Sequence, residues 1–166
     1  MQIYPAEAFR QPRHPHAIFP VTELDYPHLI QNCWPHAAAT WIKNIQRREY
    51  TIRRNHRGGG WVYRHQEQAI AFGHLTIWTH AAEISDLIVT ESQRGQGIGT
   101  MLIQSLCQES LQYPIDFIEI GVDQTNTRAL ALYQRLGFDI YREISYPQHD
   151  ASPNGPQHIF YLRIDL

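Results

Sequence analysis

A glycine-rich segment at residues 94–99 carries the clearest chemistry in this sequence. It follows an apolar run, Leu87 to Val89, and leads directly into an amphipathic stretch that begins at Thr100. A strand, a glycine turn and a helix in this order bring unpaired backbone N–H groups to the positive end of a helix dipole, where an anion binds. Because glycine has no Cβ, a phosphate can lie against its backbone. The segment therefore predicts a site for a phosphorylated cofactor.

Three kinds of phosphate loop compete for this segment. A Walker loop needs a lysine after its last glycine, which is absent, and a dinucleotide fingerprint needs G-x-G-x-x-G, whereas the glycines here read G-x-G-x-G. The third form, R/Q-x-x-G-x-G/A, is satisfied by Arg94, Gly97 and Gly99. In this form the segment resembles the pyrophosphate loop of the GNAT superfamily of acetyl-CoA-dependent N-acetyltransferases.

A second motif lies downstream, over residues 126–138. It reads NTRALALYQRLGF and resembles the N-x-x-A-x-x-L-Y-x-x-x-G-F block of the same family. The residues also make sense by themselves, because Asn126 suits a helix N-cap and Gly137 suits the position after a helix C-terminus. The two motifs and their strands cover roughly the C-terminal half of the chain, and the N-terminal half matches only in its layout.

The resemblance implies an N-acetyltransferase that moves the acetyl group of acetyl-CoA to a primary amine of a small molecule by direct attack. In the family the pantetheine arm pairs with the strand before the loop, and the Leu87 N–H is the implied donor to the oxyanion. Tyr133 is the implied general acid, with plain helix packing as the alternative, and Asn126 contacts the cofactor, acts as a cap, or does both. The implied cofactor contacts are Leu87, Val89, Arg94, Gly95, Gln96, Gly97, Ile98, Gly99, Thr100 and Asn126.

A general base is also needed, because the attacking amine must be neutral. Counting back along the strand without gaps places Glu83 where one branch of the family has its catalytic glutamate, although a strand-start Glu is also typical of a solvated edge. Asp86 is expected on the opposite face of the strand, as a structural hydrogen-bond hub or a weaker candidate base. A chain of water molecules is the third alternative.

Hydrophobic periodicity predicts the elements that position these residues. Strands are expected over 17–21, 61–65, 69–78, 83–89, 115–122, 139–145 and 158–164, and helices from Thr22 toward Trp34, over 36–50, over 99–112 and between Asn126 and Gly137. The order β-α-α-β-β-β-α-β-α-β-β predicts a mixed α/β sheet of the acyl-CoA N-acyltransferase kind. We expect one such domain over residues 17–166, preceded by a flexible arm at residues 1–16.

The acceptor is expected on the side opposite the cofactor, between residues 24–41 and 146–158. Trp34, Trp41, Tyr146 and His149 are candidate lining residues, chosen from layout alone. These residues do not select one amine over another. A protein acetyltransferase for N-terminal or lysine amines and a non-catalytic acyl-CoA-binding sensor are therefore kept as alternatives.

Composition excludes several classes of protein. The 166 residues are 43% hydrophobic and carry a formal charge of −2, which argues against disorder and against nucleic-acid binding. No apolar run approaches 18 residues, so we expect no membrane span. Cys33 and Cys107 are expected to be buried free thiols in a cytoplasmic protein. The ten histidines lack metal-ligand spacing, which predicts no metal site. The fold is compatible with a homodimer.

Overall fold

The computed structural model describes residues 7–146 and 157–166. Seven strands form one mixed sheet in the order β1-β2-β3-β4-β5-β7-β6, in which β4 and β5 pair in parallel and the other neighbours are antiparallel. The strands are β1 (Ile18–Pro20), β2 (Gly58–His65), β3 (Gln68–Ile77), β4 (Ala81–Val89), β5 (Phe117–Asp123), β6 (Asp139–Tyr146) and β7 (Gln157–Asp165). The α-helices are α1 (Tyr26–Asn32), α2 (Ala39–Arg54), α3 (Ile98–Ser110) and α4 (Thr127–Leu136). Short 3-10 helices lie at η1 (Glu7–Phe9), η2 (Pro15–Ala17), η3 (Glu23–Asp25) and η4 (Glu91–Gln93).

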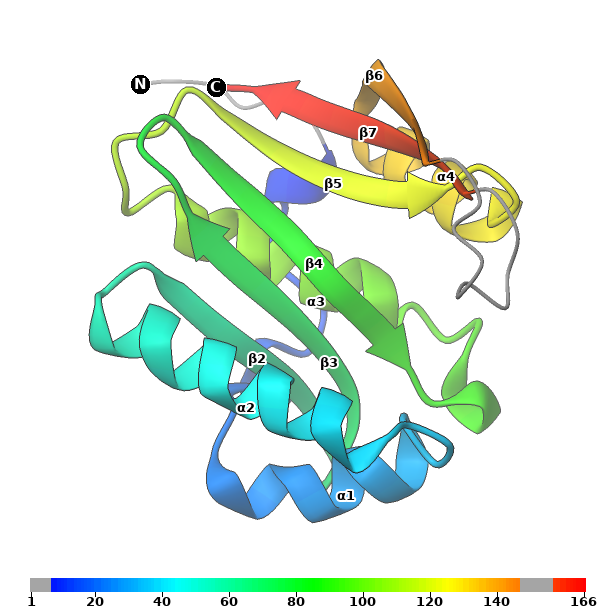
Figure 1. Ribbon diagram of the computed structural model, residues 1–166. Coiled ribbons are helices and arrows are strands. Elements are labelled where there is room, and N and C mark those ends of the chain that lie inside the picture. The colour runs from blue at the N-terminus through cyan, green and yellow to red at the C-terminus, as the bar shows by residue number, and fades with distance from the viewer. Residues whose placement is uncertain (1–6, 147–156) are drawn as a thin grey trace.

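The helices form a layer on each face of the sheet (Figure 1). Helices α1 and α2 cover β2 and β3 on one face, where Leu29 and Ile42 pack with Phe72. Helix α3 crosses the other face behind β2–β4, and α4 lies beside it near β6 and β7. On this second face Leu102 and Leu136 belong to the larger buried cluster. The element order and the mixed α/β sheet predicted from the sequence are thus confirmed.

The two central strands separate along part of their length. Parallel pairing of β4 with β5 runs from Ala81↔Phe117 to Ile84↔Ile120 and stops there. In the same region β4 carries a bulge, because Gly73 of β3 faces two residues of β4 between the pairs Phe72↔Ile88 and His74↔Ser85. The C-terminal half of β4 therefore has no paired neighbour on its β5 side among the described strands.

Several boundaries differ from the expected ones. Thr22 forms a capping box with Asp25, but the helix it opens begins as η3 and leaves Leu24 82% exposed. Helix α2 runs from Ala39 to Arg54, so it begins and ends later than the helix expected over 36–50.

The described part of the expected N-terminal arm is packed on the domain. Ala8 is fully buried, and the side chains of Gln104 and Gln108 on α3 donate hydrogen bonds to the carbonyls of Glu7 (3.0 Å) and Phe9 (3.2 Å). Polar residues on one helix thus hold this segment, a pairing that a Pro- and His-rich sequence does not predict. Residues 1–6 lie outside the described residues.

Both cysteines lie within the described residues. Cys33 and Cys107 are buried and free, as expected, and burial raises the pKa of the Cys33 thiol to about 11.

No helix within residues 7–146 and 157–166 is long and apolar enough to cross a membrane. In the same residues no group of three or more His, Cys, Asp or Glu side chains could hold a metal ion.

Candidate active site

The glycine-rich turn ends at a helix N-terminus that is open to a ligand. Gly97 is the N-cap of α3 with φ +81°, and Gly95 has φ +84°, a left-handed backbone that glycine adopts readily. The N–H of Met101 bonds to the carbonyl of Gly97, so the N–H groups of Ile98, Gly99 and Thr100 precede the first intrahelical bond. Apart from Gly97 itself, its two chain neighbours and the adjoining helix backbone, no atom of the described residues lies within 4 Å of the position that a Cβ on Gly97 would occupy. The turn therefore offers an uncovered cradle of backbone donors.

This cradle forms one end of a cleft of about 560 Å³, which we call the β4–α4 cleft. Of the predicted cofactor contacts it brings together Leu87, Val89, Arg94, Gly95, Gly97, Ile98, Gly99, Thr100 and Asn126, and Tyr133 also lines it. Gln96 is not part of this wall. The cleft follows from the separation of β4 and β5, because the edge of β4 beyond Ile84 is left free. An extended ligand can pair with such an edge.

The sequence analysis missed several residues of the cleft wall. Ile88 and Gln93 belong to β4 and the turn, and Ala129 and Leu132 lie on α4. Arg128 and Arg135 are the most informative, since two guanidinium groups add positive charge to the cleft that holds the backbone donors. They are seven residues apart on the helix that carries Tyr133. That helical spacing is the signal that could have found them.

Arg94 uses its side chain within the protein. Its Nε donates a hydrogen bond to the carbonyl of Val89, at 3.1 Å, at the end of β4. The hydroxyl of Thr90 donates to the carbonyl of Asn32, at 2.8 Å, which ties the same strand end to α1. Two hydrogen bonds thus fix the strand end from which the turn starts.

Tyr133 lies on α4 with only 5% of its surface exposed, within the cleft wall. Burial raises the pKa of its hydroxyl to about 12, so the phenol is protonated at neutral pH. Its ring packs against Phe138 at a centroid distance of 6.4 Å. The side chain therefore packs in the core and also borders the cleft, which leaves both of its predicted roles open.

Asn126 caps α4 as predicted. Its Oδ1 accepts a hydrogen bond from the N–H of Ala129 at 3.1 Å, and Gly137 ends the helix with φ +99°. Asn126 also lines the cleft, so its amide group is available to a ligand while its oxygen caps the helix.

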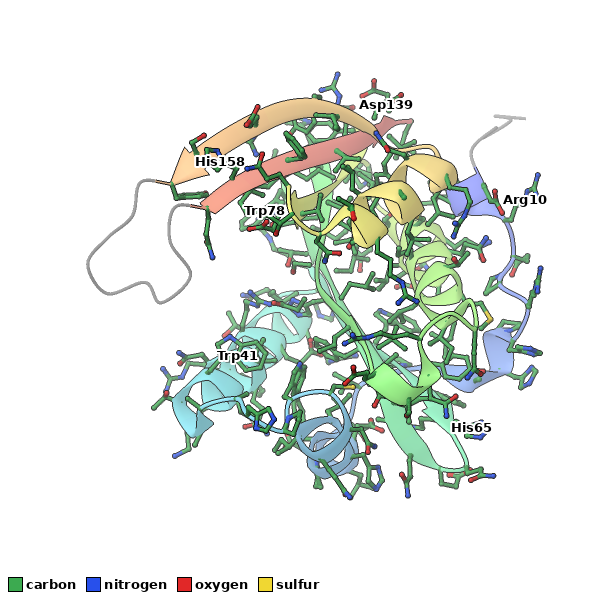
Figure 2. All side chains as sticks on the ribbon, turned by 90° about the vertical axis from the view of Figure 1, so that its right-hand side faces the viewer. Arg10, Trp41, His65, Trp78, Asp139 and His158 are labelled. Atoms are coloured by element: carbon green, nitrogen blue, oxygen red, sulfur yellow. The ribbon has the colours of Figure 1, made fainter. Side chains whose placement is uncertain are left out.

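Glu83 lies away from Tyr133, on the other face of β4. It borders a second hollow of about 430 Å³, the α2–β4 hollow, which is lined by Arg48, Thr51, Ile52, Asn55, Arg57, Thr76, Ile77, Trp78, Glu83 and Ser85. The indole Nε1 of Trp78 donates a hydrogen bond to Glu83 at 3.1 Å. In Figure 2, Trp78 and Trp41 lie on the same side of the sheet, away from α3. A base role for Glu83 would therefore act on a ligand in this hollow.

The expected orientation of Asp86 is wrong. Strict alternation along β4 would place it on the face opposite Glu83, but the bulge adds a residue and Asp86 takes φ +52°. Its carboxylate forms an ion pair with Arg48 of α2, the helix that also borders the hollow of Glu83. Asp86 and Glu83 thus face the same helix, because a bulge shifts the parity of a strand.

The candidate acceptor residues separate into different environments. Trp34 is 6% exposed and packs edge-to-face against Trp41 and Phe72, so it is a core residue. Trp41 and Tyr146 are exposed on the surface. His149 lies outside the described residues.

Comparison with known proteins agrees with this geometry. Among curated proteins none matches the sequence. Many solved structures share the fold, and three of them illustrate the likeness. A ribosomal-protein-alanine N-acetyltransferase from Brucella melitensis has 19% identity and a TM-score of 0.73, covering 90% of this chain and 99% of that one. A GNAT family acetyltransferase from Elizabethkingia anophelis with acetyl-CoA bound has 21% identity and a TM-score of 0.67, covering 90% and 97%, and an IAA acetyltransferase from Bacillus cereus has 20% identity and a TM-score of 0.65, covering 90% and 98%. A model of the acetyltransferase (GNAT) family matches residues 18–138. The chain therefore belongs to the GNAT acetyltransferase family.

Proposed function

We propose that this protein transfers the acetyl group of acetyl-CoA to a primary amine of a small molecule. One observation carries the proposal. The open backbone donors at the N-terminus of α3, the unpaired edge of β4 and the hydroxyl-bearing Tyr133 all border a single cleft. A pyrophosphate, a pantetheine arm and a thioester need these three kinds of group in this order. The Elizabethkingia relative, whose structure holds acetyl-CoA, supports the choice of donor.

Different residues of the cleft would bind different parts of acetyl-CoA. The N–H groups of residues 98–100 and the turn glycines would bind the pyrophosphate, with Arg128 and Arg135 adding positive charge near it. The backbone of Leu87 and Val89 would pair with the pantetheine arm. The Leu87 N–H would then donate to the oxyanion that forms when the amine attacks the thioester carbonyl.

Proton transfer would involve both faces of β4. The attacking amine must lose a proton, and Glu83 in the α2–β4 hollow is our candidate acceptor, with a water chain as the alternative. The departing thiolate would take a proton from Tyr133, whose hydroxyl stays protonated because burial raises its pKa to about 12. Leu87 and Ser85 are two residues apart on β4, so the two hollows approach each other at the bulge.

A small acceptor is favoured by the hollow itself. Its volume of about 430 Å³ lies within the range of about 300–1,000 Å³ that small-molecule sites occupy. Glu83 and the exposed indole of Trp78 suit a cationic amine before it loses its proton. The named acceptors of the similar structures range from a ribosomal protein to IAA, so fold likeness does not select among them.

Calorimetric titration of acetyl-CoA into the purified protein tests the donor. Release of free CoA thiol across a panel of amines, amino acids and N-terminal peptides then tests the acceptor. Binding with turnover on small amines is the expected result. Turnover on peptides alone would favour the protein-acetyltransferase alternative, binding without turnover would favour a sensor, and no binding would overturn the proposal.

A further inference from the structure

The bulge in β4 contains one residue with a left-handed backbone conformation. Asp86 has φ +52°, in the left-handed region that costs an L-amino acid energy unless the residue is Gly, Asn or Asp. The bulge begins at Ser85 and ends before Ile88, so Asp86 and Leu87 share one partner position opposite Gly73. Asp tolerates this backbone better than most residues, and contacts from neighbouring elements can hold it in place.

Helix α2 supplies that contact. The guanidinium of Arg48 forms an ion pair with the Asp86 carboxylate, which is about three-quarters buried. The hydroxyl of Ser85 lies 3.4 Å from the same carboxylate and donates to it. A half-buried guanidinium–carboxylate pair holds its geometry better than an exposed pair does. The bulge is therefore tied to the helix layer that borders the α2–β4 hollow.

The bulge also decides where Leu87 lies. One extra residue turns the Leu87 side chain toward α3, where its Cδ1 lies 3.0 Å from the point that a Cβ on Gly73 would occupy. The absence of a Cβ at Gly73 leaves the space that Leu87 fills. Leu87 consequently lines the β4–α4 cleft, while Ser85 lines the hollow on the other face.

We propose that the Arg48–Asp86 ion pair is a positioning clamp that fixes the β4 bulge and so holds the Leu87 backbone in the geometry the reaction needs. This inference rests on the proposed function, in which the Leu87 N–H donates to the oxyanion. Neither Arg48 nor Asp86 touches the reacting atoms in this account. They act through the backbone between Ser85 and Ile88.

Four variants test the clamp. Arg48→Met and Asp86→Asn each remove the ion pair, and Asn tolerates the left-handed backbone of Asp86. We expect kcat to fall about 10-fold in each, because a small misplacement of a catalytic donor is costly, while the Kd for acetyl-CoA changes less than about 3-fold. Since both variants break one contact, the double variant should lose no more than either single one. Arg48→Lys should restore part of kcat.

Arg47→Met is the matched control, because it removes a guanidinium from the neighbouring position of α2. The second readout is amide hydrogen exchange at residues 86–89 without cofactor, expected to be about 10-fold faster in Arg48→Met and Asp86→Asn and unchanged in Arg47→Met. Unchanged exchange, additive losses of kcat, or an equal loss in Arg47→Met would overturn the clamp. If the wild-type protein fails to bind acetyl-CoA, the proposed function fails, and the exchange comparison still decides whether the ion pair fixes the bulge.

Discussion

The two faces of β4 are built in different ways. The β4–α4 cleft is formed mainly by residues of one stretch of the chain, between Leu87 and Thr100, which includes the backbone donors at the start of α3, and is closed by α4. The α2–β4 hollow is formed by side chains from α2, β3 and β4, which are distant in sequence. Backbone donors present the same groups whatever the neighbouring side chains are, whereas a side-chain hollow changes with each substitution. The first face thus suits a donor of fixed chemistry, and the second suits an acceptor that differs between relatives.

The largest expected effect is on the backbone face. Gly97→Val should weaken acetyl-CoA binding more than about 1,000-fold, or ~4 kcal/mol, because the side chain fills the cradle and φ +81° is unfavourable for Val. The empty space around the Gly97 Cβ position should let the protein fold. Calorimetry measures binding, and thermal denaturation checks the fold.

Gly137→Val is the matched control for that variant. Gly137 has φ +99° and does not line the cleft. Gly137→Val therefore introduces the same backbone strain as Gly97→Val but does not block the cradle. It should lower stability and leave the Kd for acetyl-CoA unchanged. Equal losses of affinity in both variants would show that strain, and not a blocked cradle, explains the result.

The next largest effect concerns how α2 is held on the sheet. The Glu49 carboxylate is buried and accepts hydrogen bonds from the Gly60 N–H, from Arg53 and from His74 Nε2, the last at 3.0 Å. Glu49→Ala should lower the free energy of unfolding by about 3 kcal/mol, because it strands buried donors. Urea denaturation measures the free energy of unfolding, and Glu109→Ala, at a half-exposed position, is the control. A loss below about 1 kcal/mol would show that these contacts of Glu49 do not hold α2 on the sheet.

The Glu49 carboxylate also makes the stability of the protein depend on pH. Burial alone raises the pKa of Glu49, but the hydrogen bonds from His74 and Arg53 outweigh it and lower the pKa below the ordinary 4.5. The unfolded chain therefore takes up this proton first as the pH falls. Its contribution to stability is complete above about pH 4.5 and is lost as the pH drops toward the folded pKa. In urea denaturation as a function of pH, Glu49→Ala should remove this part of the acid dependence.

Tyr133→Phe should lower kcat about 100-fold while acetyl-CoA still binds, because only the proton of the general acid is lost. Tyr113→Phe, in the same hydrophobic cluster but outside the cleft wall, is the control. Burial raises the pKa of Tyr133 to about 12, so at every pH below about 11 ionisation of the phenol should leave the wild-type rate unchanged. Normal turnover of the Phe variant would leave Tyr133 as a packing residue.

The smallest expected effect is at Glu83, on the side-chain face. Glu83→Gln keeps the hydrogen bond from Trp78 and removes the base, so kcat/KM for the amine should fall about 10-fold. The remaining activity should rise with pH as the free amine becomes more abundant. Glu67→Gln in the β2–β3 turn is an exposed control. An unchanged pH profile would assign proton removal to water.

Local patterns in the sequence predict the elements around the β4–α4 cleft well. The Asn126 cap, the Gly137 stop and the strand–turn–helix order around Gly97 each depend on neighbouring residues, and the structure has them in place. Asp86 and Trp34 show the opposite case. The bulge that reorients Asp86 depends on its pairing with β3, and Trp34 is buried because Trp41 and Phe72 meet it from other elements.

The sequence by itself determined the element order, the glycine-rich turn before α3 and the family, because these follow from residues close together in the chain. Tertiary structure alone decided how far β4 separates from β5, which face Asp86 occupies, and that Glu83 and Tyr133 border different hollows. Each of these depends on strand register or on contacts between distant elements. A bulge of one residue changes the facing of a strand without any local signal in its sequence.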